Sequence, residues 1–271
     1  MDRRLTPATA RVAHVSLKGR IAAERWTEGE AAQVVVPLVD LLQAPFGARD
    51  RQLALGAGFT VVDRASGQVF GFAVKDGYCG WLPEAAVGPV TVPTHWVGTV
   101  GTHLYSEPRS SSAEVGAVPM AARLTVTGRV DKWAQTALGF VPWSHLREVE
   151  DWLADPVGIA ELFLGTPYLW GGNSRAGIDC SGLLQMVHGA CGIELPGDAD
   201  LQEAVGQEID PQAALRRGDM LFWKGHVAMV VDGDRVIHAN GHTMSVAYEG
   251  LEACIARIAK AEGPVTSRRR L

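Results

Sequence analysis

The sequence predicts a protein of mixed class, with β-strands in its first 150 or so residues and both helix and strands in the remainder. Between about residues 33 and 149, short alternating runs rich in Val, Thr and Gly are broken every several residues by Gly, Pro, Asp or Ser. That pattern is typical of small β-barrels. Farther along the chain, the apolar segment Leu183–Val187 predicts a helix, and apolar runs on both sides of Asp232-Gly233 predict a hairpin.

The strand-rich part divides into two similar blocks. Residues 33–88, here called barrel 1, and residues 89–149, here called barrel 2, are joined through Pro89 and Pro93. The block endings resemble each other, since Gly77–Pro83 parallels Leu138–Trp143. A repeat of this kind suggests two copies of one unit. Residues 1–32 are then an N-terminal extension.

Composition excludes some classes of partner. The 271 residues are 47% hydrophobic, which is enough for the cores of two or three units, and the formal net charge is −5. Nothing in this balance suggests nucleic acid as a partner. The basic run Ser267–Arg270 is expected to be solvated, as part of a short tail at residues 263–271.

Neither a disulfide framework nor a metal site is expected. The four cysteines are few and scattered, and no Cys-x-x-Cys pair is present for zinc. Free thiols fit a reducing compartment. His238 and His242 have the spacing of zinc ligands on a helix, but Asn240-Gly241 between them predicts a turn. No cofactor is predicted.

Cys180 is the candidate nucleophile. A Gly-rich run, Gly171–Gly177, leads into Asp179-Cys180-Ser181-Gly182 and so delivers the cysteine to the start of the predicted helix. Helix-start N–H groups and the helix dipole favour a thiolate, lower its pKa and can later hold an oxyanion. A single cysteine on an apolar helix is, however, more often an inert core residue.

Two histidines strengthen the catalytic interpretation. His226 opens one predicted strand and His238 ends the next, on either side of the Asp232-Gly233 turn. Antiparallel pairing would bring the two rings together, with His226 as the base and His238 as the residue that orients it. Either histidine alone would more simply satisfy a hydrogen bond within a sheet.

Four motifs resemble those of the NlpC family of bacterial cell-wall cysteine peptidases. They are Pro167–Gly172, Asp179–Leu183, Gly218–Trp223 followed by His226, and Val236–Ala239. The resemblance covers residues 150–262 and implies an α+β, papain-like catalytic domain. It also implies cleavage of peptide bonds made through the γ-carboxyl of D-glutamate. The two barrels resemble the bacterial SH3-like domains that often precede such a domain.

The resemblance implies roles for further residues near Cys180. Tyr168 matches a family tyrosine beside the nucleophile, a second oxyanion donor, although an ordinary half-buried aromatic is an equal alternative. Asp179 and Ser181 match positions that grip the substrate, and Asp179 is equally a candidate helix N-cap. Asp198 matches a residue of the substrate groove. The family's Arg and Ser on either side of it are Gly197 and Ala199 in this sequence.

The resemblance of the barrels to SH3-like domains implies that the enzyme recognises the N-terminal end of its substrate peptide. Family members with this layout accept only peptides with a free N-terminal L-alanine and act as dipeptidyl-peptidases. Tyr78 resembles the barrel tyrosine that contacts the substrate amine, and packing within the barrel is its alternative role. The acidic partner of that tyrosine has no clear match. Asp50 is the only acid in the corresponding run, Phe46–Asp50.

The N-terminus suggests a cytoplasmic location. Basic residues near Met1 are not followed by the apolar run of about 7 to 15 residues of a secretory signal. No segment approaches the ~18 apolar residues of a membrane span, so no membrane partner is expected. The predicted substrates are therefore small peptidoglycan peptides (muropeptides) undergoing recycling, with diaminopimelate or lysine as third residue. Alternatives are acyl transfer by the same Cys/His pair, and wall-peptide binding with an inactive C-terminal domain.

Overall fold

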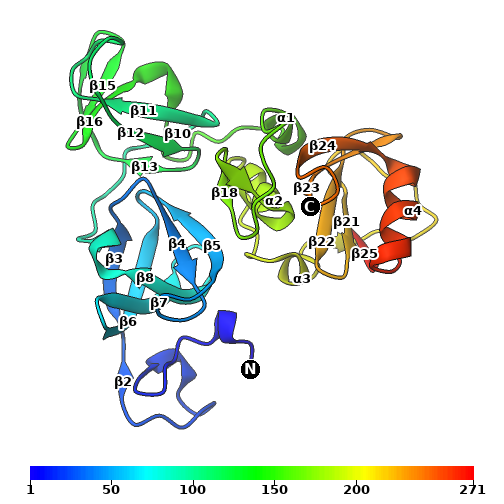
Figure 1. Cartoon of the computed structure of the whole chain (residues 1–271), viewed down its shortest axis with the longest axis horizontal. Coiled ribbons are helices and arrows are strands. Elements are labelled where there is room, and N and C mark those ends of the chain that lie inside the picture. The colour runs from blue at the N-terminus through cyan, green and yellow to red at the C-terminus, as the bar shows by residue number, and fades with distance from the viewer. The chain divides into compact units, whose positions relative to one another are not determined.

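Strands are the main secondary structure of Met1–Asp151, the first unit of the computed structural model, whereas Trp152–Leu271, the second unit, combines helices with one main sheet (Figure 1). The structure describes all residues from 1 to 271. Helices are confined to the second unit apart from short 3₁₀ turns, and the sheets are almost entirely antiparallel. The predicted α+β class is therefore confirmed.

Barrel 1 is an antiparallel sheet with the strand order β5-β4-β8-β7-β6-β3-β9. Its strands are β3 (Glu30–Val34), β4 (Leu38–Leu42), β5 (Arg49–Ala54), β6 (Gly58–Ala65), β7 (Gln68–Ala73), β8 (Cys79–Pro83) and β9 (Val87–Gly88). Because β3 pairs with β6 from Glu30 onward, the barrel begins three residues before the boundary expected at residue 33. Alternate apolar residues point inward, as the period of a strand requires. The buried side chains of Leu41, Leu53, Phe59 and Val69 build this core.

Barrel 2 consists of two smaller antiparallel sheets, ordered β12-β11-β16-β15-β14 and β13-β10-β17. Its strands are β10 (His95–Val97), β11 (Gly101–Tyr105), β12 (Glu114–Pro119), β13 (Arg123–Leu124), β14 (Val126–Val130), β15 (Trp133–Thr136), β16 (Gly139–Pro142) and β17 (Leu146–Glu148). Leu55 of barrel 1 is buried in the same cluster as Val97, Leu104 and Val141. The two barrels therefore share part of their apolar packing.

The repeat expected from the sequence is visible where each barrel ends. Strand β8 ends at Pro83, which begins a 3₁₀ turn at Glu84–Ala86. Strand β16 ends in the same way at Pro142, followed by a 3₁₀ turn at Trp143–His145. The proposed correspondence between the two block endings is thus confirmed in the backbone.

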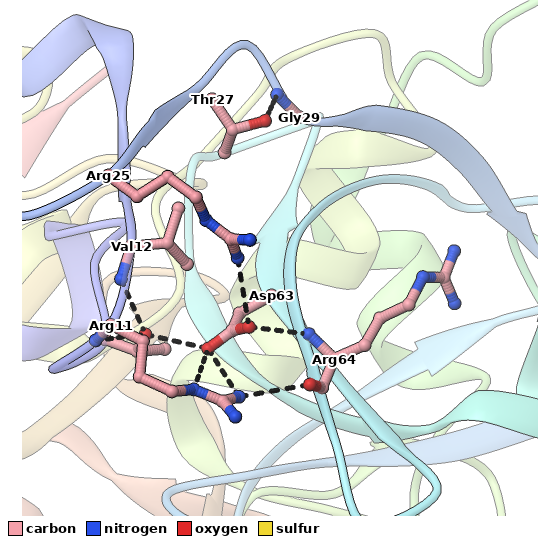
Figure 2. Close-up of polar contacts among 8 residues, drawn as sticks. Arg11, Val12, Arg25, Thr27, Gly29, Asp63 and Arg64 are labelled. Atoms are coloured by element: carbon pink, nitrogen blue, oxygen red, sulfur yellow. Dashed lines mark hydrogen bonds and ion pairs between the residues drawn. The ribbon is translucent and has the colours of Figure 1, made fainter.

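The N-terminal extension is fixed to barrel 1 by a buried carboxylate. The extension contains β1 (Ala13–His14) and β2 (Trp26–Thr27), which pair in parallel, and 3₁₀ turns at Arg3–Leu5 and Val15–Leu17. Asp63 of β6 is 6% exposed, and its Oδ2 accepts hydrogen bonds of 2.8 Å from both Thr9 and Arg11. Burial alone would raise the pKa of Asp63, but these donors outweigh it and hold the pKa below its usual value. Figure 2 shows Arg11 and Arg25 directed at this carboxylate.

The second unit has one buried helix beside a six-stranded sheet of order β20-β25-β21-β22-β23-β24. Its elements are α1 (Pro156–Glu161), β18 (Asn173–Ser174), β19 (Gly177–Ile178), α2 (Cys180–Gly189), α3 (Ala199–Gln202), β20 (Gln207–Glu208), β21 (Met220–Trp223), β22 (His226–Val230), β23 (Arg235–Asn240), β24 (Ser245–Gly250), α4 (Leu251–Ala261) and β25 (Ser267–Arg270). Every residue of α2 from Cys180 to His188 is buried, including the polar residues Ser181, Gln185 and His188, so α2 is a central helix of this unit. No helix combines the length and the apolar character needed to cross a bilayer.

The prediction that residues 263–271 form a solvated tail was wrong. Residues Ser267–Arg270 are strand β25, which pairs with β21 on one side and β20 on the other. Arg270 reaches Asp219, a 1% exposed carboxylate, through two hydrogen bonds of 2.7 and 2.6 Å. A run of basic residues is usually solvated. Here the buried carboxylate of Asp219 needs a positively charged partner, and strand β25 supplies Arg270.

Substituting Arg270→Met should lower the melting temperature of the second unit by about 5 °C or more, because it leaves the buried carboxylate of Asp219 without its charged partner. Thermal unfolding followed by circular dichroism measures this. Arg268→Met is the matched control, since Arg268 lies on the same strand but bonds only to the exposed carbonyl of Pro211. Equal melting of both variants would contradict the importance of the pair.

Candidate active site

Asp179 fixes the start of α2, and with it the position of Cys180. Its Oδ1 accepts a 2.6 Å hydrogen bond from the N–H of Gly182, and its Oδ2 accepts one of 2.8 Å from the N–H of Gly171. The first bond is an N-cap and the second ties the helix to the Gly-rich loop before it. A Cβ on Gly182 would lie 2.5 Å from the carbonyl oxygen of Gly172, so only glycine permits this approach. The N-cap alternative for Asp179 is confirmed.

Ser181 and α3 complete this arrangement. The Ser181 hydroxyl donates to Asp179 Oδ1 at 3.2 Å. The Ser181 carbonyl accepts a 2.9 Å hydrogen bond from Gln202, which is fully buried in α3. Asp198 immediately precedes α3 and does not cap it with its side chain. The structure therefore gives Asp179 and Ser181 architectural roles, and substrate contacts by these three predicted residues stay predictions.

Burial dominates the chemistry of the Cys180 thiol. The residue is 6% exposed, and burial, with a smaller effect of the Asp179 charge, raises the pKa of Cys180 to about 12. The backbone N–H groups of Val227 and Ser181 act in the opposite direction and favour the thiolate. The sequence-based expectation of a lowered pKa was wrong, because the helix start lies in the interior and desolvation outweighs the N–H groups.

The hairpin brings the two histidines together as predicted. Strands β22 and β23 pair antiparallel, and His226 Nε2 lies 2.9 Å from His238 Nδ1. Burial, and then the proximity of His238, lowers the pKa of His226 to about 3. Burial likewise lowers the pKa of His238 to about 4. Both rings are neutral at pH 7, so His226 is in the form that accepts a proton.

Tyr168 lies near the same helix start. It forms an isolated bridge with Ile178, two residues before Cys180. Burial raises the pKa of the Tyr168 hydroxyl above its usual value, and the charges of Cys180 and Asp179 add to the effect. The hydroxyl stays protonated and can donate a hydrogen bond, which agrees with the predicted oxyanion role.

A carboxylate that the sequence interpretation missed lies beyond His238. Glu249 of β24 places Oε2 at 3.2 Å from His238 Nε2, and both its oxygens accept hydrogen bonds from Arg257, at 2.8 and 2.7 Å. His238 pairs with Ala247 across the β23–β24 hairpin, so Glu249, two residues on, shares its face. The sequence would have indicated this contact only if the register between β23 and β24 had been known.

The same cluster has the composition of a metal site. Ligand atoms of His238, Glu249 and Cys254 lie within 4.8 Å of one another. Arg257, however, already occupies both oxygens of Glu249, and its positive charge would repel a metal cation there. The cluster is better described as a network of hydrogen bonds and charges that ends at the His238 ring.

Comparison with protein families identifies both parts of the chain. Residues 165–257, which include Cys180, His226 and His238, match the NlpC/P60 family model. Residues 41–87 match the model of the bacterial dipeptidyl-peptidase SH3 domain. This chain carries an NlpC/P60 peptidase domain behind a bacterial SH3 domain. The NlpC/P60 domain is a domain of the cysteine peptidase type, and the predicted family resemblance is confirmed.

Several known proteins are similar to this chain or to part of it. A γ-D-glutamyl-L-lysine dipeptidyl-peptidase of Bacillus cereus is 28% identical over 70% of this chain and 67% of its own length. A protein of the same name from Bacillus subtilis is 38% identical, but the match spans 31% of each chain. The crystal structure of an NlpC/P60 family protein from Bacillus cereus has a TM-score of 0.75 at 22% identity, covering 89% of this chain and 99% of that one. That structure supports the fold.

Tyr78 belongs to the SH3 domain, where the whole residue is 2% exposed and packs in the core of barrel 1. The guanidinium of Arg51 lies 5.5 Å from the centre of the ring. Asp50, the candidate acidic partner, bonds with Arg3 and, at 2.7 Å, with Gln43. The packing role of Tyr78 is therefore confirmed, and its contact with a substrate amine stays a prediction.

Alkylation of Cys180 in the NlpC/P60 domain by iodoacetamide should accelerate about tenfold per pH unit between pH 7 and 9, without reaching a plateau. The raised pKa of Cys180 means that the reactive thiolate fraction grows with pH throughout this range. Mass spectrometry of the Cys180 peptide measures the rate, with Cys180→Ser as the assignment control. A plateau near neutral pH would instead indicate a stable thiolate–imidazolium pair.

Proposed function

We propose that this protein is a dipeptidyl-peptidase that hydrolyses the bond between γ-D-glutamate and the diamino acid, diaminopimelate or lysine, in peptides derived from peptidoglycan. One observation carries the proposal: a buried Cys180 with a paired His226 and His238 occurs in an NlpC/P60 domain that follows a bacterial dipeptidyl-peptidase SH3 domain. The similar Bacillus cereus protein is a γ-D-glutamyl-L-lysine dipeptidyl-peptidase, and its name supports the same bond.

The proposed reaction begins with Cys180 and His226 both neutral, as the directions of their pKa shifts favour. As the sulfur attacks the amide carbonyl carbon, the thiol proton passes to His226, so that no free thiolate builds up in the buried site. The resulting oxyanion accepts hydrogen bonds from the helix-start N–H of Cys180 and from the hydroxyl of Tyr168.

The tetrahedral intermediate then collapses. The C–N bond breaks, and the proton held by His226 goes to the departing amine of the diamino acid, which leaves an acyl thioester on Cys180. A water molecule gives its proton to His226 and attacks the thioester carbonyl. Release of the γ-D-glutamyl carboxyl group returns the proton to the sulfur, so both groups end as they began.

The proposed substrate carries a free N-terminal L-alanine. Selection of the peptide end is supported by the SH3 domain match at residues 41–87, because the domain model is named for dipeptidyl-peptidases. We further propose that Tyr78 contributes to recognition of the amine through its hydroxyl, while its ring packs in barrel 1. The hydroxyl and the ring can be tested separately.

We propose that the substrates are small released peptides that are recycled in the cytoplasm, a reducing compartment. All four cysteines are free, and three of them, including Cys180, are buried. A reduced Cys180 is required for the proposed thioester chemistry.

Cys180→Ala should abolish release of L-Ala-γ-D-Glu from the tripeptide L-Ala-γ-D-Glu-diaminopimelate, because the attacking sulfur is removed. Liquid chromatography with mass spectrometry measures the dipeptide. Cys191→Ala, at a half-buried cysteine of the same domain, is the control and should keep wild-type activity. Unchanged release by Cys180→Ala would refute the mechanism, and an amine-linked product in place of the free acid would indicate acyl transfer.

The free tripeptide should be cleaved at least about 100-fold faster than its N-acetylated form, since a site built for an amine loses its polar partners when the amine is blocked. Tyr78→Phe keeps the packing ring, and should raise KM for the free tripeptide about tenfold without changing the melting temperature. Equal rates for both peptides would refute the requirement for a free N-terminus. An unchanged KM would exclude the Tyr78 hydroxyl.

A further inference from the structure

His238 has two ring nitrogens with different partners, and each partner restricts where the ring can carry hydrogen. Its Nδ1 lies 2.9 Å from His226 Nε2, and its Nε2 lies 3.2 Å from Glu249 Oε2. His238 is completely buried, so water does not replace either partner. The contact with Glu249 is close but not aligned as a hydrogen bond, so the carboxylate acts on the neutral ring mainly through the attraction between its negative charge and the dipole of an N–H group at Nε2.

Glu249 offers that contact as an ionised carboxylate. Its two hydrogen bonds from Arg257, at 2.8 and 2.7 Å, lower the pKa of Glu249 to about 2. The Cys254 thiol donates to it as well, and burial, with the Glu249 charge, raises the pKa of Cys254 to about 12. Near neutral pH the carboxylate therefore accepts hydrogen bonds and donates none.

Because the carboxylate of Glu249 carries no hydrogen, it determines which ring nitrogen carries hydrogen in each of the two histidines. Neutral imidazole has one N–H, and the carboxylate of Glu249 favours placing it on Nε2 of His238. Nδ1 of His238 is then an acceptor, so the N–H in the contact with His226 must belong to Nε2 of His226. Nδ1 of His226 remains without hydrogen, which is the form a general base requires.

Arg257 helps to keep the ring of His238 neutral, because it balances the charge of Glu249. An unpaired Glu249 carboxylate would stabilise a second proton on His238, and both nitrogens of that ring would then be donors. Nδ1 of His238 would then donate to Nε2 of His226. The hydrogen of His226 would move to its Nδ1, the nitrogen that the proposed base needs free of hydrogen. The charged and titratable groups that act on His238 are His226 of β22, Glu249 of β24, Arg257 and Cys254 of α4, and His242.

We propose that Glu249, anchored by Arg257, is a positioning residue of the active site that fixes the tautomer of His238 and, through it, the tautomer of the base His226. Its effect on turnover rests on the peptidase function proposed above, whereas its effect on the two rings does not. Glu249 does not touch the reacting atoms and acts only through the histidines.

Nitrogen-15 NMR of histidine-labelled protein tests the proposal without substrate, because the ring shifts distinguish the two tautomers. In the wild type, His226 and His238 should both carry hydrogen on Nε2. Glu249→Leu removes the acceptor and should move hydrogen to Nδ1 on both rings. Glu249→Gln keeps an acceptor oxygen and should retain the wild-type tautomers. Glu252→Leu, an exposed acid in the first turn of α4, is the matched control and should leave both rings unchanged.

Kinetics and titration complete the test. Glu249→Leu should lower kcat for the tripeptide about 10- to 100-fold with little change in KM, and Glu249→Gln should recover most of that loss. Arg257→Gln should raise the pH at which His238 becomes protonated in the NMR titration.

Two outcomes would overturn the proposal: hydrogen on Nδ1 of His238 in the wild type, or wild-type tautomers in Glu249→Leu. If Glu249→Leu does not fold, the wild-type spectrum and the Arg257→Gln titration still decide the question. A wild-type protein that cleaves no peptide but shows the expected tautomers would refute the proposed function and leave this inference standing.

Discussion

The N-cap formed by Asp179 is the contact on which the rest of the catalytic domain depends. Its carboxylate accepts N–H groups from Gly182 in the helix and from Gly171 in the preceding loop, so it joins the two segments that enclose Cys180. Because this helix start is buried, the thiol has little access to water. Desolvation then determines the chemistry of the site, and the helix dipole has a secondary effect.

A desolvated nucleophile places strict demands on its base. The raised pKa of Cys180 and the lowered pKa of His226 disfavour the charged forms of both groups at rest, so in the proposed mechanism the proton moves during attack. In the proposed mechanism His226 must also present the correct nitrogen, and the fully buried ring of His238 restricts that choice because water does not reach it. The series of contacts from His226 through His238 to Glu249 and Arg257 meets this requirement with neutral rings and a balanced ion pair.

Buried carboxylates recur as anchors elsewhere in the chain. Asp63 holds the N-terminal extension on barrel 1 through Arg11, and Asp219 holds the last strand of the second unit through Arg270. In both cases a partly exposed arginine brings a terminal segment to a carboxylate that the fold has already buried. The charge therefore specifies where each terminal segment docks, because an unpaired carboxylate in the interior is costly.

The sequence alone determined the strand-rich repeat, the position of Cys180 at a helix start and the meeting of His226 with His238, because these depend on local periodicity, turns and short spacings. The raised pKa of Cys180, the strand at Ser267–Arg270 and the contact between Glu249 and His238 were decided only by the tertiary structure. Desolvation depends on everything that surrounds a group. Likewise, a contact across strands depends on their register, and neither can be read from neighbours in the chain.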